Sequence, residues 1–116
     1  MPQHPKKIAV VGAGIGGLAT ALYLDRLGHG VTILERFDAA RPVGSGLMRQ
    51  PPGLAVLADL GMADTILALG SRIDHLHGAD CDSGRTVLDV AYRGGNFGLA
   101  VHRAALFNTL RDAVVA

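Results

Sequence analysis

The stretch KIAVVGAGIGGLATALYLDRLGHGVTILER, residues 7–36, decides the fold of this chain. It begins with a β-branched run, 6–11, which predicts a fully buried strand. Apolar residues at helical spacing follow over 14–27, and Gly28 stands where a helix end favours a left-handed residue. A second apolar run, 31–35, predicts another buried strand. Strand, helix and strand within about thirty residues predict a βαβ unit with parallel strands.

The turn between the first strand and the helix has the spacing Gly-x-Gly-x-x-Gly. Gly12 permits a tight turn, Gly14 lets the backbone approach a pyrophosphate, and Gly17 lets the helix pack against the strand. Free N–H groups and the dipole at the helix N-terminus favour a bound phosphate. The turn therefore predicts a dinucleotide-binding site, made of the consecutive residues Gly12, Ala13, Gly14, Ile15, Gly16 and Gly17.

Glu35 is the only glutamate in the chain, beside nine aspartates. It closes the second predicted strand, 18 residues beyond Gly17, and an acid about 20 residues after such a turn accepts hydrogen bonds from a ribose hydroxyl. Its charge would repel an adenosine 2′-phosphate, which disfavours NADP as the first ligand. NAD and FAD both remain, because the glycine pattern does not distinguish them. The alternative is that these glycines serve only the turn and its packing.

Glycine and proline divide the rest of the chain into short elements. The sequence predicts a loop over 37–50, helices over 51–60 and 62–69, paired strands over 73–76 and 86–90, a strand over 98–101 and a helix over 103–115. We expect one α/β domain, residues 1–116, built as a Rossmann-like βαβ fold with a parallel sheet and a small β-hairpin.

Composition excludes several classes of protein. An apolar content of 49% with 18% charged residues excludes a disordered tail. A formal net charge of +1 gives no electrostatic basis for binding nucleic acid. The apolar run 8–24 contains four glycines and is too short for a membrane span. The single cysteine, Cys81, excludes an internal disulfide and favours a cytoplasmic location.

Two further candidate sites lack support from the sequence. His75 and His77 would share one face of a strand, as metal ligands do. No second ligand cluster with zinc spacing accompanies them, so we expect a polar hairpin and no metal site. Ser45 and Ser83 have glycine neighbours but lack the Gly-x-Ser-x-Gly pattern of a hydrolase.

Three segments together resemble one family over nearly the whole chain. Residues 8–36 are similar to the N-terminus of FAD-dependent oxidoreductases. The segment GSGLMRQPPGLAVL, residues 44–57, resembles a loop and helix of the single-component flavoprotein aromatic hydroxylases, the p-hydroxybenzoate hydroxylase-like monooxygenases. The segment VHRAAL, residues 101–106, is similar to that family's strand followed by Arg-x-x-Leu.

This resemblance implies FAD as the cofactor and NAD(P)H as the reductant. The implied reaction is O₂-dependent hydroxylation of an aromatic or similar small molecule, and no residue of this chain is implied as a catalytic base. Arg41 and Arg49 are interpreted as ordinary loop arginines, with an approach to the pyrophosphate as the alternative. The implied positions are the pyrophosphate for Gly12, Gly14 and Gly17, the adenosine ribose for Glu35, the adenine for Arg36 and the flavin side of the cofactor for Arg103. The alternative for Arg103 is that it only caps a helix start or faces solvent.

Members of that family are several times longer than this chain. Their second FAD-contacting motif and their substrate-covering sheet lie downstream of the segments matched here. We therefore expect an N-terminal portion that retains FAD weakly and has no turnover alone, with a homo-oligomer or a complementing C-terminal portion as partner. Two alternatives are an NAD-binding dehydrogenase domain and a non-catalytic fragment that acts only as a binding or interaction module.

Overall fold

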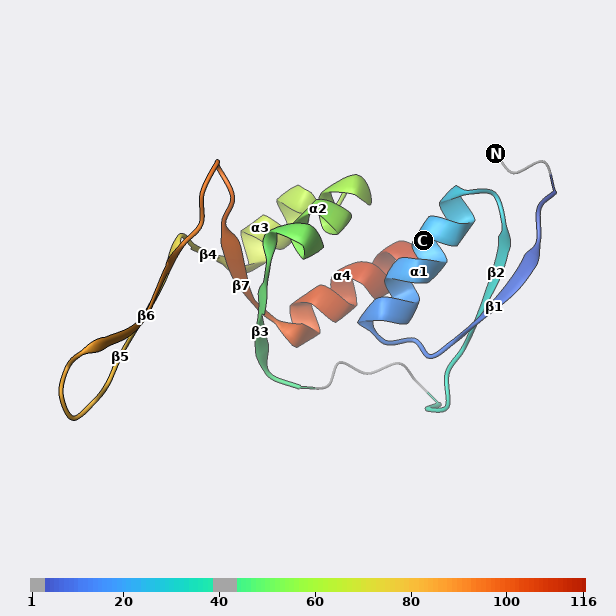
Figure 1. The fold of residues 1–116 in the computed structure, drawn as a ribbon. Coiled ribbons are helices and arrows are strands. Elements are labelled where there is room, and N and C mark those ends of the chain that lie inside the picture. Colours follow the sequence, from blue (N-terminus) through green and yellow to red (C-terminus); the bar gives the residue numbers. More distant parts are fainter. Residues whose placement is uncertain (1–3, 39–43) are drawn as a thin grey trace. The chain divides into compact units, whose positions relative to one another are not determined.

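The structure is a computed structural model that describes residues 4–38 and 44–116, and the chain forms two compact units. Unit 1 comprises Met1–Ser45 and His102–Ala116, and unit 2 comprises Gly46–Val101. Figure 1 shows the elements of both units along the chain. The chain thus leaves unit 1 after residue 45 and returns to it at residue 102.

Unit 1 is built on the predicted βαβ unit. Strand β1 (Lys7–Val11) and strand β2 (Gly30–Leu34) pair in parallel, in register from Lys7 opposite Gly30 to Val11 opposite Leu34. Helix α1 (Ile15–Arg26) connects them and contacts both strands. It ends where Gly28 adopts a φ of 87°, as its place at the helix end predicts. Helix α4 (Arg103–Val115) packs against α1 and has the predicted bounds.

The strands of unit 1 end on the same side on which its helices begin. Figure 1 shows the carboxyl ends of β1 and β2 lying at the same end of the unit as the N-termini of α1 and α4. Ligands of open α/β sheets bind outside the carboxyl ends of the strands. Helix N-termini carry positive partial charge and unsatisfied N–H groups. This end of unit 1 is therefore suited to an anionic ligand.

The expectation that both strands of unit 1 are fully buried is wrong. Side chains along β1 and β2 alternate between half-buried and exposed, with Val11 84% and Leu34 51% exposed. Helix α1 covers the face that carries Val10, and the alternation shows that the opposite face is open in the part of the chain described. A parallel strand is buried on both faces only where both faces are covered.

Unit 2 consists of two short helices, a three-stranded sheet and a hairpin. Helix α2 (Pro51–Asp59) and helix α3 (Ala63–Leu69) confirm the two predicted helices. The sheet has the order β3 (Gly46–Arg49), β7 (Gly98–His102), β4 (Ser71–Ile73), with β4 antiparallel to β7. Strands β5 (His75–Ala79) and β6 (Thr86–Ala91) form the antiparallel hairpin.

Two predictions for unit 2 need correction. The expected loop 37–50 contains β3, a strand that exists through its place beside β7, some fifty residues later. The expected strand 73–76 is divided at Asp74, because residues before it pair with β7 and residues after it pair with β6. Both differences arise from pairing between segments distant in sequence, which local periodicity does not register.

Each unit has its own set of buried side chains. Leu18 and Ala21 of α1 and Leu106 and Leu110 of α4 are buried in unit 1. In unit 2 the buried apolar residues are Leu57, Met62, Ile66, Leu99 and Val101. The described residues include no helix long and apolar enough to cross a membrane.

Candidate dinucleotide site

The glycine turn is fixed in place by contacts that require glycine at two positions. Gly12 adopts a φ of 103°, and its N–H donates to the Leu34 carbonyl at 2.6 Å. This hydrogen bond attaches the turn to the end of β2. A Cβ added to Gly17 would lie 2.0 Å from the Gly12 carbonyl oxygen. The first turn of α1 therefore packs directly on the backbone, as the glycine spacing predicts.

The outer side of the same turn is open. A Cβ added to Gly14 or Gly16 would meet no atom of the described part of the chain within 4 Å. Gly14 is the N-cap of α1, and no side chain among the residues that the structure describes caps the helix. The first intrahelical bond runs from the Leu18 N–H to the Gly14 carbonyl at 2.9 Å. The N–H groups of the first turn precede this bond and have no helical acceptor. Space and unused donors together fit the pyrophosphate of a dinucleotide.

Glu35 lies against this turn, as its position in the sequence predicts. Its Oε2 accepts the Ala13 N–H at 2.7 Å, and its Oε1 accepts the Arg36 N–H at 2.8 Å. The hydrogen bond from Ala13 is the main cause that holds the pKa of the Glu35 carboxyl below its ordinary value. A half-buried carboxylate thus stays ionised beside the open turn. Its assignment to the ribose hydroxyls stays a prediction.

The lowered pKa predicts a pH dependence of stability. The ionised Glu35 stabilises the fold above the ordinary pKa of 4.5, and this contribution is lost as the pH falls from 4.5 through the lowered pKa of the folded state. We expect the free energy of unfolding of the wild type to fall more steeply with acid than that of Glu35→Gln. Asp80, whose pKa is lowered by hydrogen bonds from Ser83, titrates in both proteins, so it cancels from the comparison. Parallel pH profiles from chemical denaturation would contradict the prediction.

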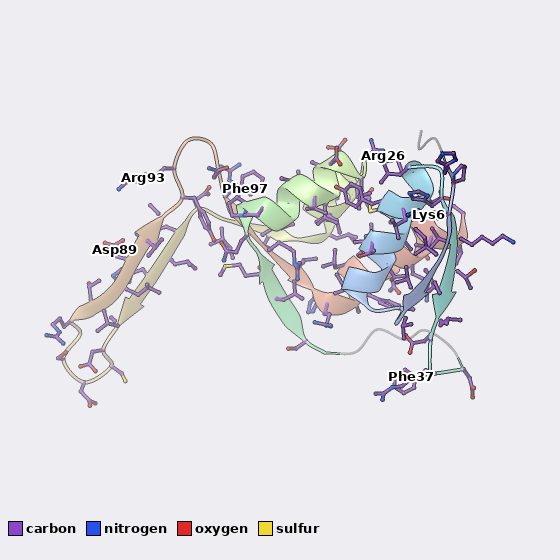
Figure 2. The ribbon with its side chains drawn as sticks, turned by 45° about the vertical axis from the view of Figure 1, so that its right-hand side comes forward. Lys6, Arg26, Phe37, Asp89, Arg93 and Phe97 are labelled. Carbon is purple, nitrogen blue, oxygen red and sulfur yellow. The ribbon has the colours of Figure 1, made fainter. Side chains whose placement is uncertain are left out.

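Arg36 and Phe37 extend the site beyond Glu35. Both side chains are exposed, and the Arg36 guanidinium carbon lies 4.8 Å from the centre of the Phe37 ring. Figure 2 shows Phe37 just beyond the end of β2, away from the body of unit 1. The position of Arg36 is consistent with its predicted place near an adenine, which stays a prediction. Phe37 is assigned no role from the sequence, and its place two residues after Glu35 is the signal that could have included it.

The arginines of interest are distributed over both units. Arg103 begins α4 in unit 1, is exposed, and donates its backbone N–H to the Ser45 carbonyl at 2.9 Å. It thus shares a unit with the glycine turn, and its contact with the cofactor stays a prediction. Arg49 is the last residue of β3 in unit 2, so its interpretation as a loop residue is wrong. Its Nε is buried and has no hydrogen-bond partner among residues 4–38 and 44–116. Arg41 lies outside the described residues.

The polar residues of the hairpin form pairs. His75 contacts Asp89 through Nε2 and Oδ1, and His77 Nε2 lies 3.3 Å from Thr86 Oγ1. Among residues 4–38 and 44–116, no three His, Cys, Asp or Glu side chains are grouped so as to hold a metal ion. Cys81 is exposed in the hairpin turn.

The fold and the open glycine turn define a dinucleotide-binding α/β protein. The profile of the family described as FAD dependent oxidoreductase matches residues 7–108, and the chain belongs to this family. The 6-hydroxynicotinate 3-monooxygenase of Bordetella bronchiseptica is 31% identical over 97% of this chain and 31% of its own length.

Solved structures show the same fold. HpxO of Klebsiella pneumoniae, solved in complex with FAD and uric acid, has a TM-score of 0.77 and 27% identity, over 97% of this chain and 29% of that one. The tetrameric form of 2-methyl-3-hydroxypyridine-5-carboxylic acid oxygenase has a TM-score of 0.83 and 23% identity, over 98% and 30%. The chain thus spans about 30% of the length of these proteins, and it matches their N-terminal part.

Proposed function

We propose that this chain is the FAD-binding N-terminal region of a flavin-dependent monooxygenase. The observation that carries the proposal is the open glycine turn at the N-terminus of α1, with an ionised carboxylate against it. Membership of the FAD-dependent oxidoreductase family supports FAD over NAD as the dinucleotide. The names of the relatives support hydroxylation of an aromatic or similar small molecule as the activity of the whole protein.

The residues of this chain have binding roles in the proposal. The N–H groups at the start of α1 hold the pyrophosphate, Glu35 accepts hydrogen bonds from the adenosine ribose, and Arg36 lies along the adenine. Arg103 contributes a fixed positive charge toward the flavin side, since a guanidinium stays protonated. Bound FAD supplies the redox chemistry, and NAD(P)H is the reductant that we propose.

Separate observations bear on the location of the protein and on its assembly. We infer a cytoplasmic location from the single cysteine, which favours a reducing compartment. A homo-oligomer is supported by the tetrameric form in which one structural neighbour was solved. A complementing C-terminal portion is the alternative partner, and the domain assignment of residues 1–116 to the FAD-binding region is part of the same proposal.

Titration of the full chain with FAD, NAD and NADP tests this function. Two-dimensional ¹H–¹⁵N NMR detects binding even at millimolar affinity, which suits an N-terminal portion expected to retain FAD weakly. We expect FAD to shift the amide signals of 12–17 and to bind more tightly than NAD, with NADP weakest because of the Glu35 charge. Preference for NAD over FAD would favour a dehydrogenase domain. Absence of all binding would favour a non-catalytic interaction module.

A further inference from the structure

The backbone around Gly44 and Ser45 is joined to the start of α4 by two contacts. The Arg103 N–H donates to the Ser45 carbonyl at 2.9 Å. The Arg103 side chain also crosses Gly44, because a Cβ added there would lie 2.6 Å from Arg103 Cδ and 3.5 Å from its Nε. All three residues belong to unit 1. The stem of Arg103 thus occupies the space that any side chain at position 44 would need.

We propose that Gly44 is a positioning residue for Arg103, and this rests on the proposed function of Arg103 in FAD binding. Because position 44 has no Cβ, the aliphatic stem of Arg103 can lie along the backbone there. This packing restricts the direction in which the guanidinium points. A long arginine side chain has many rotamers, and their loss on binding costs free energy. A stem already fixed by Gly44 loses fewer of them when the cofactor binds.

The conformation of Gly44 offers a competing explanation. Its φ of 99° disfavours every residue with a Cβ, so glycine would be required there without any contribution from Arg103. The two explanations differ in what happens to Arg103. An added methyl group would meet the middle of this flexible side chain and not backbone, so on our proposal Arg103 is displaced in addition to any backbone strain at position 44.

Gly44→Ala and a matched control test the proposal in the full chain. The control is Gly84→Ala, because Gly84 has a φ of 72° and an added Cβ there meets nothing within 4 Å. We expect Gly44→Ala to move the Arg103 Nε–H signal in NMR spectra without ligand, and Gly84→Ala to leave it unchanged. With FAD, we expect Gly44→Ala to raise the dissociation constant about tenfold, which corresponds to about 1.4 kcal/mol.

A double-substitution cycle with Arg103→Ala completes the test. In the Arg103→Ala background we expect Gly44→Ala to cause no further loss of FAD affinity and a smaller drop in thermal stability than in the wild type. The comparison of thermal stabilities remains informative even where Gly44→Ala alone folds too poorly for FAD binding to be measured. An unmoved Arg103 signal, or equal losses in both backgrounds, would overturn the proposal while the proposed function stands. Failure of the wild-type chain to bind FAD would overturn the proposed function, and this inference with it.

Discussion

Replacing Gly17 with alanine is expected to lower the free energy of unfolding by about 3 kcal/mol, the upper end of the usual cost of overpacking. The added Cβ would lie 2.0 Å from the oxygen and 3.1 Å from the carbon of the Gly12 carbonyl. Both are backbone atoms, and the Gly12 N–H is already bonded to Leu34 on β2. Relief of the clash would therefore require α1 to move away from the sheet.

Thermal unfolding followed by circular dichroism measures this loss, which corresponds to a fall in Tm of about 10–20 °C for a chain of this size. Gly14→Ala is the matched control, because Gly14 has a φ of −78° and open space at the Cβ position. We expect Gly14→Ala to fold like the wild type but to bind FAD more weakly, since its methyl group enters the space assigned to the pyrophosphate. Equal stability of the two variants would show that Gly17 is not required by packing.

The local parts of unit 1 could be predicted from sequence because their signals are local. β-Branched runs mark β1 and β2, and Gly28 adopts the positive φ that its place at a helix end requires. The spacing between Gly12 and Glu35 also places the carboxylate at the turn, where it accepts the Ala13 N–H. Such features depend on the residue itself and its near neighbours.

The remaining features depend on segments distant in sequence. Strand β3 forms beside β7, and the expected strand 73–76 is divided because its two ends have different partners. The exposure of Val11 depends on what covers the second face of the sheet. Periodicity reports that a segment is apolar, and it does not report which element will cover it.

The residues of the candidate site also divide into those with a local sequence signal and those whose contacts join distant segments. Arg103 was connected with the glycine turn only through a family resemblance, and the structure places both in unit 1. No sequence pattern indicated that Gly44 accommodates the stem of Arg103, because that contact joins positions about sixty residues apart. A glycine whose function is to leave room for another side chain has no signature of its own in a single sequence.

Replacing Glu35 with glutamine is expected to raise the dissociation constant for adenosine nucleotides about tenfold, because hydrogen bonds to charged groups are stronger than those to neutral ones. Glutamine keeps one side-chain oxygen that can accept the Ala13 N–H, so the contact with the turn is retained while the hydrogen bond from the Arg36 N–H is lost. Glu35→Ala removes this acceptor as well. We therefore expect alanine to weaken binding further and to loosen the turn, visible as faster hydrogen exchange of the Ala13 amide.

The sharpest readout is discrimination against a phosphate on the ribose. AMP and adenosine 2′,5′-bisphosphate differ only by the phosphate on the 2′ oxygen, where the Glu35 carboxylate is assigned, and the negative charge should make the wild type favour AMP. In Glu35→Gln the affinity for AMP should fall while that for the 2′-phosphorylated nucleotide should not, so the difference between the two affinities should become small. Asp80→Asn is the matched control, since this carboxylate also has a lowered pKa but lies in the hairpin turn of unit 2. An unchanged preference in Glu35→Gln would contradict the assignment of Glu35 to the ribose, because it would show that the Glu35 charge does not affect binding of a 2′-phosphate.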